Sequence, residues 1–335
     1  MKKIAYLILA HDEEKLLLRL IQSLNYNADF YIHVDKSSDF NFKKFEKFKN
    51  VFFVERVDVF WGGFSVVDAT LNLINATVES EDDYVKVVLL SGHDYPVRSA
   101  KYIYNFLNAN KDNFINGFNI SDVEIKQIKK EIIHPHFYDI KFFEKNGKIF
   151  KIIRKISNIF CKLFFLKSTV KISPQIKSDI YKGSQWWAIN SNVIEYFYEY
   201  THNPQKSNNY IKRMKKIFAP DEKFFHTLFF NSQFSKTNQV SGPKKFPTDI
   251  YYKYPKGSVI RTTAYMANLK NIHLINPDLR KIYTIEDLNY ILKETSSNDE
   301  ILFIRKVNIN ESAELLDFLD EKNEEKNDFS CNQHL

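Results

Sequence analysis

Hydrophobic runs and helical apolar stripes alternate along the first ninety residues of the chain. Residues 3–10 form a continuous apolar run, which is typical of a strand buried on both faces. Residues 13–24 follow with leucine and isoleucine at helical spacing, at Leu16, Leu17, Leu20, Ile21 and Leu24. A buried strand followed by an amphipathic helix predicts the start of an α/β unit.

The same alternation continues to residue 90. The pattern predicts a helix at residues 65–79 and strands at 29–35, 51–54 and 84–90. Strands that alternate with helices indicate a mostly parallel sheet, in which ligands bind beyond the carboxyl ends of the strands. Those positions hold His11, Asp35 and Asp94. We expect a nucleotide site there, and plain loop residues are the alternative.

A proline followed by two carboxylates marks a second candidate site. Pro220 suits the first position of a helix, because its missing N–H costs nothing there. Asp221 and Glu222 then fall in the first turn, near the positive end of the helix dipole. The apolar residues 224–230 would anchor this helix in a core. Ordinary helix-start chemistry explains the pattern, and a catalytic carboxylate is the alternative.

Tryptophan occurs three times, and two of the three are adjacent. In a strand, Trp186 and Trp187 would point to opposite faces, so one can enter the core while the other lines a cleft. An indole beside a cleft can stack on the apolar face of a sugar ring. Trp61 precedes Gly62 and Gly63, which permit backbone shapes closed to other residues. The alternative for Trp186 and Trp187 is that both pack in the core or in an interface.

Composition is compatible with a large enzyme. The 335 residues are 44% hydrophobic, enough for one elaborate domain or two small ones. Two cysteines are too few to staple a secreted fold and favour a reducing compartment. We expect no signal peptide in the first residues, and no apolar run approaches the roughly 20 residues of a membrane span.

The net charge of +7 is concentrated in residues 126–171. Lysine and arginine alternate there with isoleucine, phenylalanine and leucine, as in a helix that lies on an anionic membrane. A basic helix packed on its own domain is the alternative. We expect no nucleic-acid partner, because no recognition motif is present and the rest of the chain is balanced in charge. Residues 311–335 turn acidic and polar, and a last helix should fray into a disordered tail after about Glu321.

Six short segments carry a resemblance to a known family. They are residues 5–11, 30–36, 61–67, 89–96, 183–187 and 220–222. In this order they resemble motifs of the core-2/I-branching β-1,6-N-acetylglucosaminyltransferases (glycosyltransferase family 14), which also include the peptide O-xylosyltransferases. The resemblance spans residues 3–310, and the basic stretch is similar to an insertion of bacterial members.

The resemblance implies a GT-A glycosyltransferase fold, which is an α/β, Rossmann-like, mostly parallel sheet flanked by helices, with a basic helical insertion. Four parts follow from it. They are a nucleotide-sugar-binding half at 1–125, the basic amphipathic insertion at 126–171, an acceptor and catalytic half of the same domain at 172–310, and a C-terminal helix with an acidic tail at 311–335.

The implied reaction is inverting transfer of a sugar from a UDP-sugar to a glycan acceptor, with β-linked N-acetylglucosamine as the expected sugar. The resemblance places the catalytic base at Glu222. The expected donor contacts are His11, Asp35, Asp94, Arg280 and Lys306, and the expected acceptor contacts are Trp61, Trp187 and Asp221. If the alignment shifts by one residue, Lys281 takes the place of Arg280.

The resemblance also implies that no metal and no cofactor is needed. The animal N-acetylglucosaminyl members lack the DXD motif, and residues 91–94 here hold one carboxylate rather than two. Cationic side chains would then neutralise the leaving UDP. A metal-dependent xylosyl- or hexosyltransferase of the same fold is one alternative, and an inactive carbohydrate-binding protein is another.

The expected acceptor is a glycan or a lipid-linked glycan of a bacterial surface polysaccharide. Such glycans are built on lipid carriers, so we expect a cytoplasmic protein held at the inner face of the bacterial cytoplasmic membrane. The basic residues of 126–171 would supply a peripheral contact with anionic lipid.

Overall fold

The computed structural model describes most of the chain. The described residues are 2–124, 129, 132–135, 156, 167–246, 248, 271–275 and 281–329, with the side chains of 325–329 left aside. Most of the predicted basic insertion and Arg280 lie outside them. The expected membrane contact of the insertion therefore stays a prediction.

A five-stranded sheet forms the centre of the molecule, in the order β10-β4-β1-β2-β3. β1 pairs in parallel with both β2 and β4, so that Leu7 lies opposite Tyr31 and Leu89. β3 continues the parallel arrangement, and β10 is antiparallel to β4. The strands are β1 (Lys3–Ala10), β2 (Ala28–Val34), β3 (Val51–Phe53), β4 (Tyr84–Ser91) and β10 (Ala188–Ile189).

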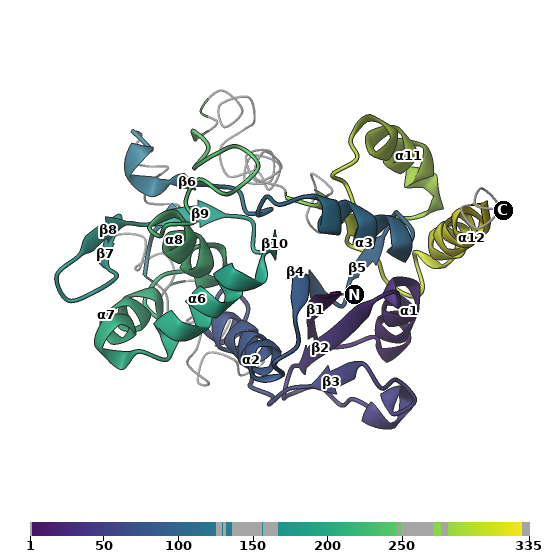
Figure 1. The fold of residues 1–335 in the computed structure, drawn as a ribbon, viewed down its shortest axis with the longest axis horizontal. Coiled ribbons are helices and arrows are strands. Elements are labelled where there is room, and N and C mark those ends of the chain that lie inside the picture. Colours follow the sequence, from purple (N-terminus) through teal and green to yellow (C-terminus); the bar gives the residue numbers. More distant parts are fainter. Residues whose placement is uncertain are drawn as a thin grey trace.

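Helices cover both faces of this sheet (Figure 1). One buried cluster includes Leu20, Ile103 and Leu316, and a second includes Leu73 and Phe225. On the first side lie α1 (Glu14–Leu24), α3 (Ala100–Ala109), α11 (Leu288–Ser297) and α12 (Ala313–Phe329). On the second side lie α2 (Ser65–Glu79), α6 (Ser191–Thr201), α7 (Pro204–Met214) and α8 (Phe224–Phe230).

Three small sheets complete the fold. β12 (Phe303–Arg305) pairs in parallel with β11 (His273–Ile275) and antiparallel with β5 (Asp94–Pro96). Two antiparallel ribbons consist of β6 (Gly117–Asn119) with β9 (Tyr181–Gly183), and β7 (Thr169–Lys171) with β8 (Lys177–Asp179). The 3-10 turns are η1 (Phe42–Phe45), η2 (Ile120–Asp122), η4 (Pro220–Glu222) and η5 (Ile285–Asp287).

The predicted class of fold is confirmed, since the sheet is mostly parallel and flanked by helices. Two local predictions differ from the structure. Pro220–Glu222 forms a 3-10 turn rather than the first turn of an α-helix, because the backbone of Lys223 leaves the helical region at φ −130°. Helix α12 continues to Phe329, past the residue at which fraying was expected.

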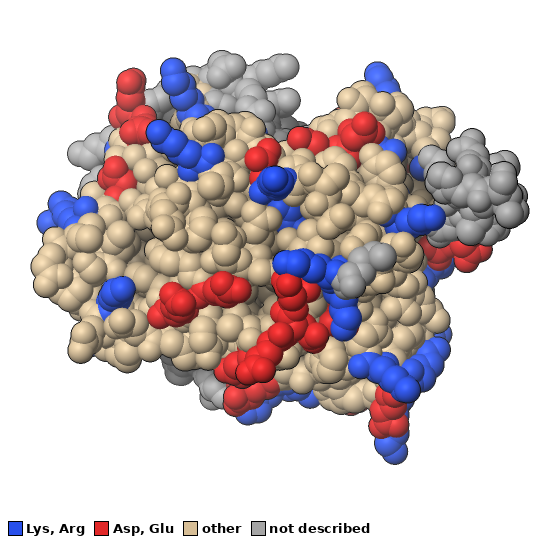
Figure 2. Space-filling view, in the orientation of Figure 1, with Lys and Arg blue, Asp and Glu red and all other residues tan. Residues whose placement is uncertain are grey.

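The charge of the surface and the hydropathy of the helices can be compared with the predictions about nucleic acid and membrane. On the face shown in Figure 2, lysine and arginine are interspersed with aspartate and glutamate over the described atoms. That part of the surface is not a continuous basic face of the kind that nucleic-acid binding uses. Among the described residues, no helix is both long and apolar enough to cross a membrane.

Candidate functional site

The carboxyl ends of the parallel strands bring polar side chains to one edge of the central sheet. His11 follows β1, Asp35 follows β2, and His93 lies in the turn between β4 and β5. Because β1 is the neighbour of both β2 and β4, the three residues share this edge. Burial is the main cause that lowers the pKa of His11, and the charge of Asp35 acts to raise it. The edge is the predicted donor site.

Lys306 reaches the same edge from the other end of the chain. It follows β12, and the next residue, Val307, donates its N–H to the carbonyl of His93 at 3.0 Å. Lys306 is half-buried. Burial, and then the neighbouring charge of Arg305, lowers the pKa of Lys306 below its ordinary value. The structure thus brings the predicted donor-site lysine to the edge that holds His11.

The loop after β2 is held by Arg56, which our sequence interpretation missed. Its guanidinium donates to the carbonyls of Val34 at 3.0 Å and Ser38 at 2.7 Å. Within the loop, Oδ1 of Asp35 accepts from the backbone N–H and the hydroxyl of Ser37, each at 2.8 Å. Arg56 therefore fixes the loop that carries Asp35, and a donor contact by Asp35 stays a prediction.

Asp94 is fully buried, and a donor contact by this residue stays a prediction. Its carboxylate accepts from the N–H of Ser91 at 2.7 Å, from Arg305 at 2.8 Å and from His273 at 3.2 Å. Burial opposes the charged form, but Arg305 and His273 hold the pKa of Asp94 at about 2. Asp94 therefore positions the strand that leads into Lys306.

The Pro-Asp-Glu turn lies at the same edge of the sheet. Helix α2 connects two parallel strands, so it begins at Ser65 beside their carboxyl ends. The loop just before α2 supports the turn, because the carbonyl of Gly62 accepts the N–H of Ala219 at 2.9 Å. Gly62 has φ +77°, a conformation that favours glycine. This contact joins the second candidate site to the sheet edge.

Glu222 forms an ion pair with Lys182, a residue of β9. The ammonium of Lys182 contacts Oε2 of Glu222. The side chain of Lys182 is 6% exposed, whereas that of Glu222 is 27% exposed, so the carboxylate reaches the surface and the ammonium does not. The sequence analysis did not select Lys182, and its place directly before the Gly-Ser-Gln-Trp-Trp segment was the available signal.

Two further ionisable groups surround this pair. Asp221 is half-buried, and burial followed by the charge of Glu222 raises the pKa of Asp221 to about 6. Lys223 is buried and donates to the carbonyls of Phe218 at 2.9 Å and Ala219 at 3.0 Å. Burial lowers the pKa of Lys223 to about 7. An acceptor contact by Asp221 stays a prediction.

The tryptophans divide differently from our prediction. Trp187 is fully buried and packs edge-on against Phe225 at 5.9 Å, so it lies in the core here, and its contact with the acceptor stays a prediction. Its neighbour Trp186 is 8% exposed and stacks under Arg305, with 4.3 Å between the guanidinium and the ring. Trp61 is 77% exposed in the loop beside the Pro-Asp-Glu turn. That position keeps Trp61 as a predicted acceptor contact.

The predicted arginine of the donor site lies outside the described residues. Arg280 therefore stays a prediction. The register alternative, Lys281, is described, and its ammonium pairs with Asp287 at 2.5 Å. Asp287 also closes the capping box of η5 through the N–H of Thr284. Lys281 thus has a local role at the start of α11.

The arrangement defines a class of protein. A mostly parallel sheet between helices, with polar groups at its carboxyl edge and an acidic turn beside them, is a GT-A-like glycosyltransferase fold. A family model described as "Branch: Core-2/I-Branching enzyme" matches residues 4–242. The chain belongs to this family. The resemblance inferred from the six sequence segments is therefore confirmed for the family, and the bacterial subtype stays a prediction.

Individual relatives are distant. "Xylosyltransferase oxt" of Drosophila pseudoobscura pseudoobscura is 26% identical over 218 residues, which cover 62% of this chain and 22% of the relative. "Beta-1,3-galactosyl-O-glycosyl-glycoprotein beta-1,6-N-acetylglucosaminyltransferase" of Bos taurus is 25% identical over 232 residues, covering 67% and 48%. "Xylosyltransferase" of Ciona intestinalis is 24% identical over 245 residues, covering 70% and 26%. The chain thus spans less than half the length of these relatives.

Proposed function

We propose that the chain is an inverting glycosyltransferase that moves N-acetylglucosamine from its UDP donor to a glycan acceptor in β linkage. The family and the name of the Bos taurus relative support the reaction class and the sugar. The observation that carries the proposal is Glu222, a partly exposed carboxylate in the Pro-Asp-Glu turn beside the donor edge.

Glu222 is proposed as the general base. The acceptor oxygen forms a bond to the anomeric carbon while the bond from that carbon to UDP breaks, and Glu222 takes the hydroxyl proton. Inversion in one step needs a single base, whereas retention by double displacement needs a nucleophile as well. Lys182 holds Oε2 of Glu222, which leaves Oε1 to accept the proton.

The charge of the leaving UDP is assigned to cationic side chains. Lys306 is half-buried at the carboxyl edge, where water screens its charge less than at an exposed site. His11 lies close enough for the charge of Lys306 to act on its pKa. Arg280 completes the proposed set. We propose that transfer needs no metal ion.

A xylosyl- or hexosyltransferase that requires a metal is the second candidate. The printed names of the Drosophila and Ciona relatives favour xylose as the transferred sugar. A third candidate is a carbohydrate-binding protein that holds UDP without turning over a UDP-sugar. The ion pair of Glu222 with Lys182 supports an active site over this last candidate.

A donor screen tests the proposal. The purified chain is incubated with each UDP-sugar in turn, with and without a mixture of glycan acceptors, and UDP release is followed. We expect release that depends on the acceptor, fastest with UDP-N-acetylglucosamine, and a β-anomeric product by NMR. Preference for UDP-xylose would support the second candidate. Binding of UDP without release from any donor would support the third.

The acceptor and the place of action follow from the same proposal. We propose a lipid-linked glycan of a bacterial surface polysaccharide, met at the inner face of the cytoplasmic membrane. The basic composition of residues 126–171 supports a peripheral contact with anionic lipid. Co-sedimentation with anionic and neutral vesicles tests this part separately from transfer.

A further inference from the structure

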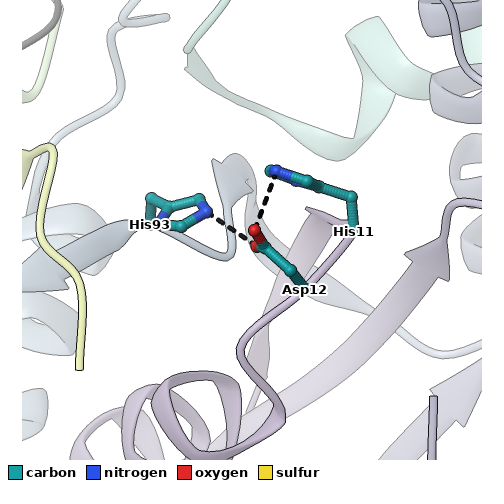
Figure 3. Close-up of side chains that lie close together, drawn as sticks. All are labelled: His11, Asp12 and His93. Atoms are coloured by element: carbon teal, nitrogen blue, oxygen red, sulfur yellow. Dashed lines mark hydrogen bonds and ion pairs between the residues drawn. The ribbon is translucent and has the colours of Figure 1, made fainter. Parts of the chain in front are cut away.

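Three side chains with metal-ligand chemistry meet at the donor edge. The ligand atoms of His11, Asp12 and His93 all lie within 4.8 Å of one another. Figure 3 shows the carboxylate of Asp12 between the two imidazole rings. Oδ1 of Asp12 lies 2.9 Å from Nε2 of His93, and Oδ2 lies 3.3 Å from Nε2 of His11. The sequence analysis selected only His11 of these three.

The proton on His93 can be assigned from its other contact. Nδ1 of His93 lies 3.0 Å from the carbonyl oxygen of Val307, and a carbonyl only accepts. Nδ1 therefore carries a hydrogen, and a ring with that one hydrogen has a lone pair on Nε2. That lone pair faces the carboxylate oxygen of Asp12. Two acceptors at 2.9 Å need a cation between them, which is either a proton or a metal ion.

The second contact of His93 is the one that metal-binding histidines make. A ligating histidine usually donates its remaining N–H to a backbone carbonyl or a carboxylate, which fixes the ring and its tautomer. Here Val307 accepts that N–H, and its own N–H donates to the carbonyl of His93. The turn of His93 is also tied to β1, because Gly92 donates to the carbonyl of Leu9 at 2.9 Å. The ring is therefore held before any ligand arrives.

Two neighbouring charges set the electrostatics of the cluster. Oε2 of Glu13 lies 4.0 Å from Nδ1 of His93 and adds a second negative charge. The ammonium of Lys306 is near enough for Asp12 to raise its pKa, although burial is the larger effect and lowers it. The carboxylates of Asp12 and Glu13 beside His93 provide negative charge that suits a divalent cation.

We propose that His11, Asp12 and His93 bind one divalent first-row transition-metal ion, with Zn²⁺ as the reference ion. Two imidazole nitrogens and one carboxylate oxygen form a ligand set that suits zinc, and they leave a position open for water or another ligand. The proposal concerns binding of the ion. It goes beyond the proposed transfer reaction and does not require that reaction to occur.

Metal titration of the untagged chain tests the site. The protein is stripped with a chelator, dialysed, and titrated with Zn²⁺ by calorimetry and with Co²⁺ by visible absorption. We expect one ion per chain, a d–d spectrum of a site with nitrogen ligands, and weaker binding at acidic pH, because protons compete with the metal ion for the ligand atoms. Asp12→Asn and His11→Gln should each weaken binding about tenfold or more.

His202→Gln is the matched control. His202 is also an exposed histidine, and its Nδ1 also contacts a backbone carbonyl, that of Tyr198 at 2.9 Å. This variant should bind Zn²⁺ as the wild type does. Circular dichroism checks that each variant is folded. If Asp12→Asn is not folded, His11→Gln still tests the site, because it alters an exposed side chain and should keep the fold.

Two results would overturn the inference. One is Zn²⁺ binding by the wild type that is no tighter than binding by Asp12→Asn and His11→Gln. The other is an NMR titration of the stripped protein in excess Zn²⁺ that still shows His93 carrying both ring protons at neutral pH. In either case the cation between His93 and Asp12 is a proton. Neither result bears on glycosyl transfer, which the donor screen measures separately.

Discussion

Glu222 takes the single proton of the proposed reaction, so its removal should separate binding from turnover. We expect Glu222→Gln to fold, to bind UDP as the wild type does, and to lose about 10²- to 10⁴-fold in kcat. Calorimetry with UDP and the acceptor-dependent release assay measure the two effects. Glu195→Gln, an exposed change on α6, is the control. More than about a tenth of wild-type turnover in Glu222→Gln would remove this residue from the mechanism.

Asp94 links stability to pH. The folded state holds its pKa at about 2, below the ordinary value of 3.8, because Arg305 and His273 outweigh burial. The folded carboxylate therefore binds protons less readily than the unfolded one. Its contribution to stability is complete above about pH 4 and is lost as the pH falls toward 2.

Asp94→Asn should lower the free energy of unfolding by about 3–5 kcal/mol at pH 7, because it leaves Arg305 partly buried without its charge partner. Denaturant titration at several pH values measures this. The difference between wild type and variant should shrink between pH 4 and pH 2. A constant difference across that range would contradict the assigned role of Asp94.

At the scale of single residues, the sequence shows which motifs are present better than it shows which side chains contact one another. His11 was selected from a strand end and Lys306 from the family resemblance, and their contacts with the donor stay predictions. Trp187 was assigned to the cleft, since alternation alone does not say which of two adjacent rings is inside. Lys182 was missed because its pairing with Glu222 joins segments that are distant in the sequence.

At the scale of elements, the loop before α2 determines where the Pro-Asp-Glu turn sits. A Cβ at Gly62 would lie 2.6 Å from Cε2 of Phe218, and its φ of +77° disfavours any other residue. Gly62→Ala should cost about 1–2 kcal/mol for the backbone and about 1–3 kcal/mol for the clash. We also expect kcat to fall, because Phe218 leads into the turn that carries Glu222.

Gly242→Ala is the control for this change. Gly242 also has a positive φ, of +135°, but among the described residues no atom beyond its chain neighbours lies within 4 Å of the added Cβ. This variant should lose stability through the backbone alone and keep its turnover. Thermal unfolding and the UDP-release assay compare the two variants. Equal effects on turnover would show that contact with Phe218 is unimportant for the catalytic turn.

The helices and strands could largely be predicted from local patterns in the sequence. The predicted helix at 65–79 coincides with α2, and the strand at 3–10 coincides with β1, because both carry an uninterrupted apolar period. The turn at Pro220–Glu222 was taken for an α-helix, since proline and acidic residues also begin helices. The helical path is interrupted at Lys223, whose φ of −130° no local pattern predicts.

On the scale of the whole molecule, the donor edge depends on a cation from the C-terminal part of the described chain. Lys306→Ala should weaken UDP binding about tenfold or more, because a hydrogen bond to a charged group contributes about 1.5–3 kcal/mol. Calorimetry measures the affinity, and Lys177→Ala on β8, an exposed residue, is the control. Unchanged UDP affinity in Lys306→Ala would remove it from the donor site.

Chelation tests the proposed independence from metal. Transfer should persist in EDTA, because Lys306 still carries its charge when any ion is removed. Turnover that stops in EDTA and returns with Zn²⁺ or Mn²⁺ would contradict metal independence and favour the second candidate function. Metal binding at His11, Asp12 and His93 would be unaffected by that outcome, since titration measures it directly.

The pairing of β12 with β5 has a consequence for how the protein is made. When the ribosome has released the residues of β1 to β5, the antiparallel partner of β5 has not yet been synthesised. The backbone groups at this edge of β5 therefore stay unpaired until residues 303–305 emerge. Unpaired strand edges are sites at which nascent chains can aggregate. Lys306 arrives directly after that strand. A nascent chain that ends before residue 303 therefore lacks both β12 and Lys306. If the proposed UDP site needs Lys306, ribosome-stalled chains of that length should fail to retain UDP.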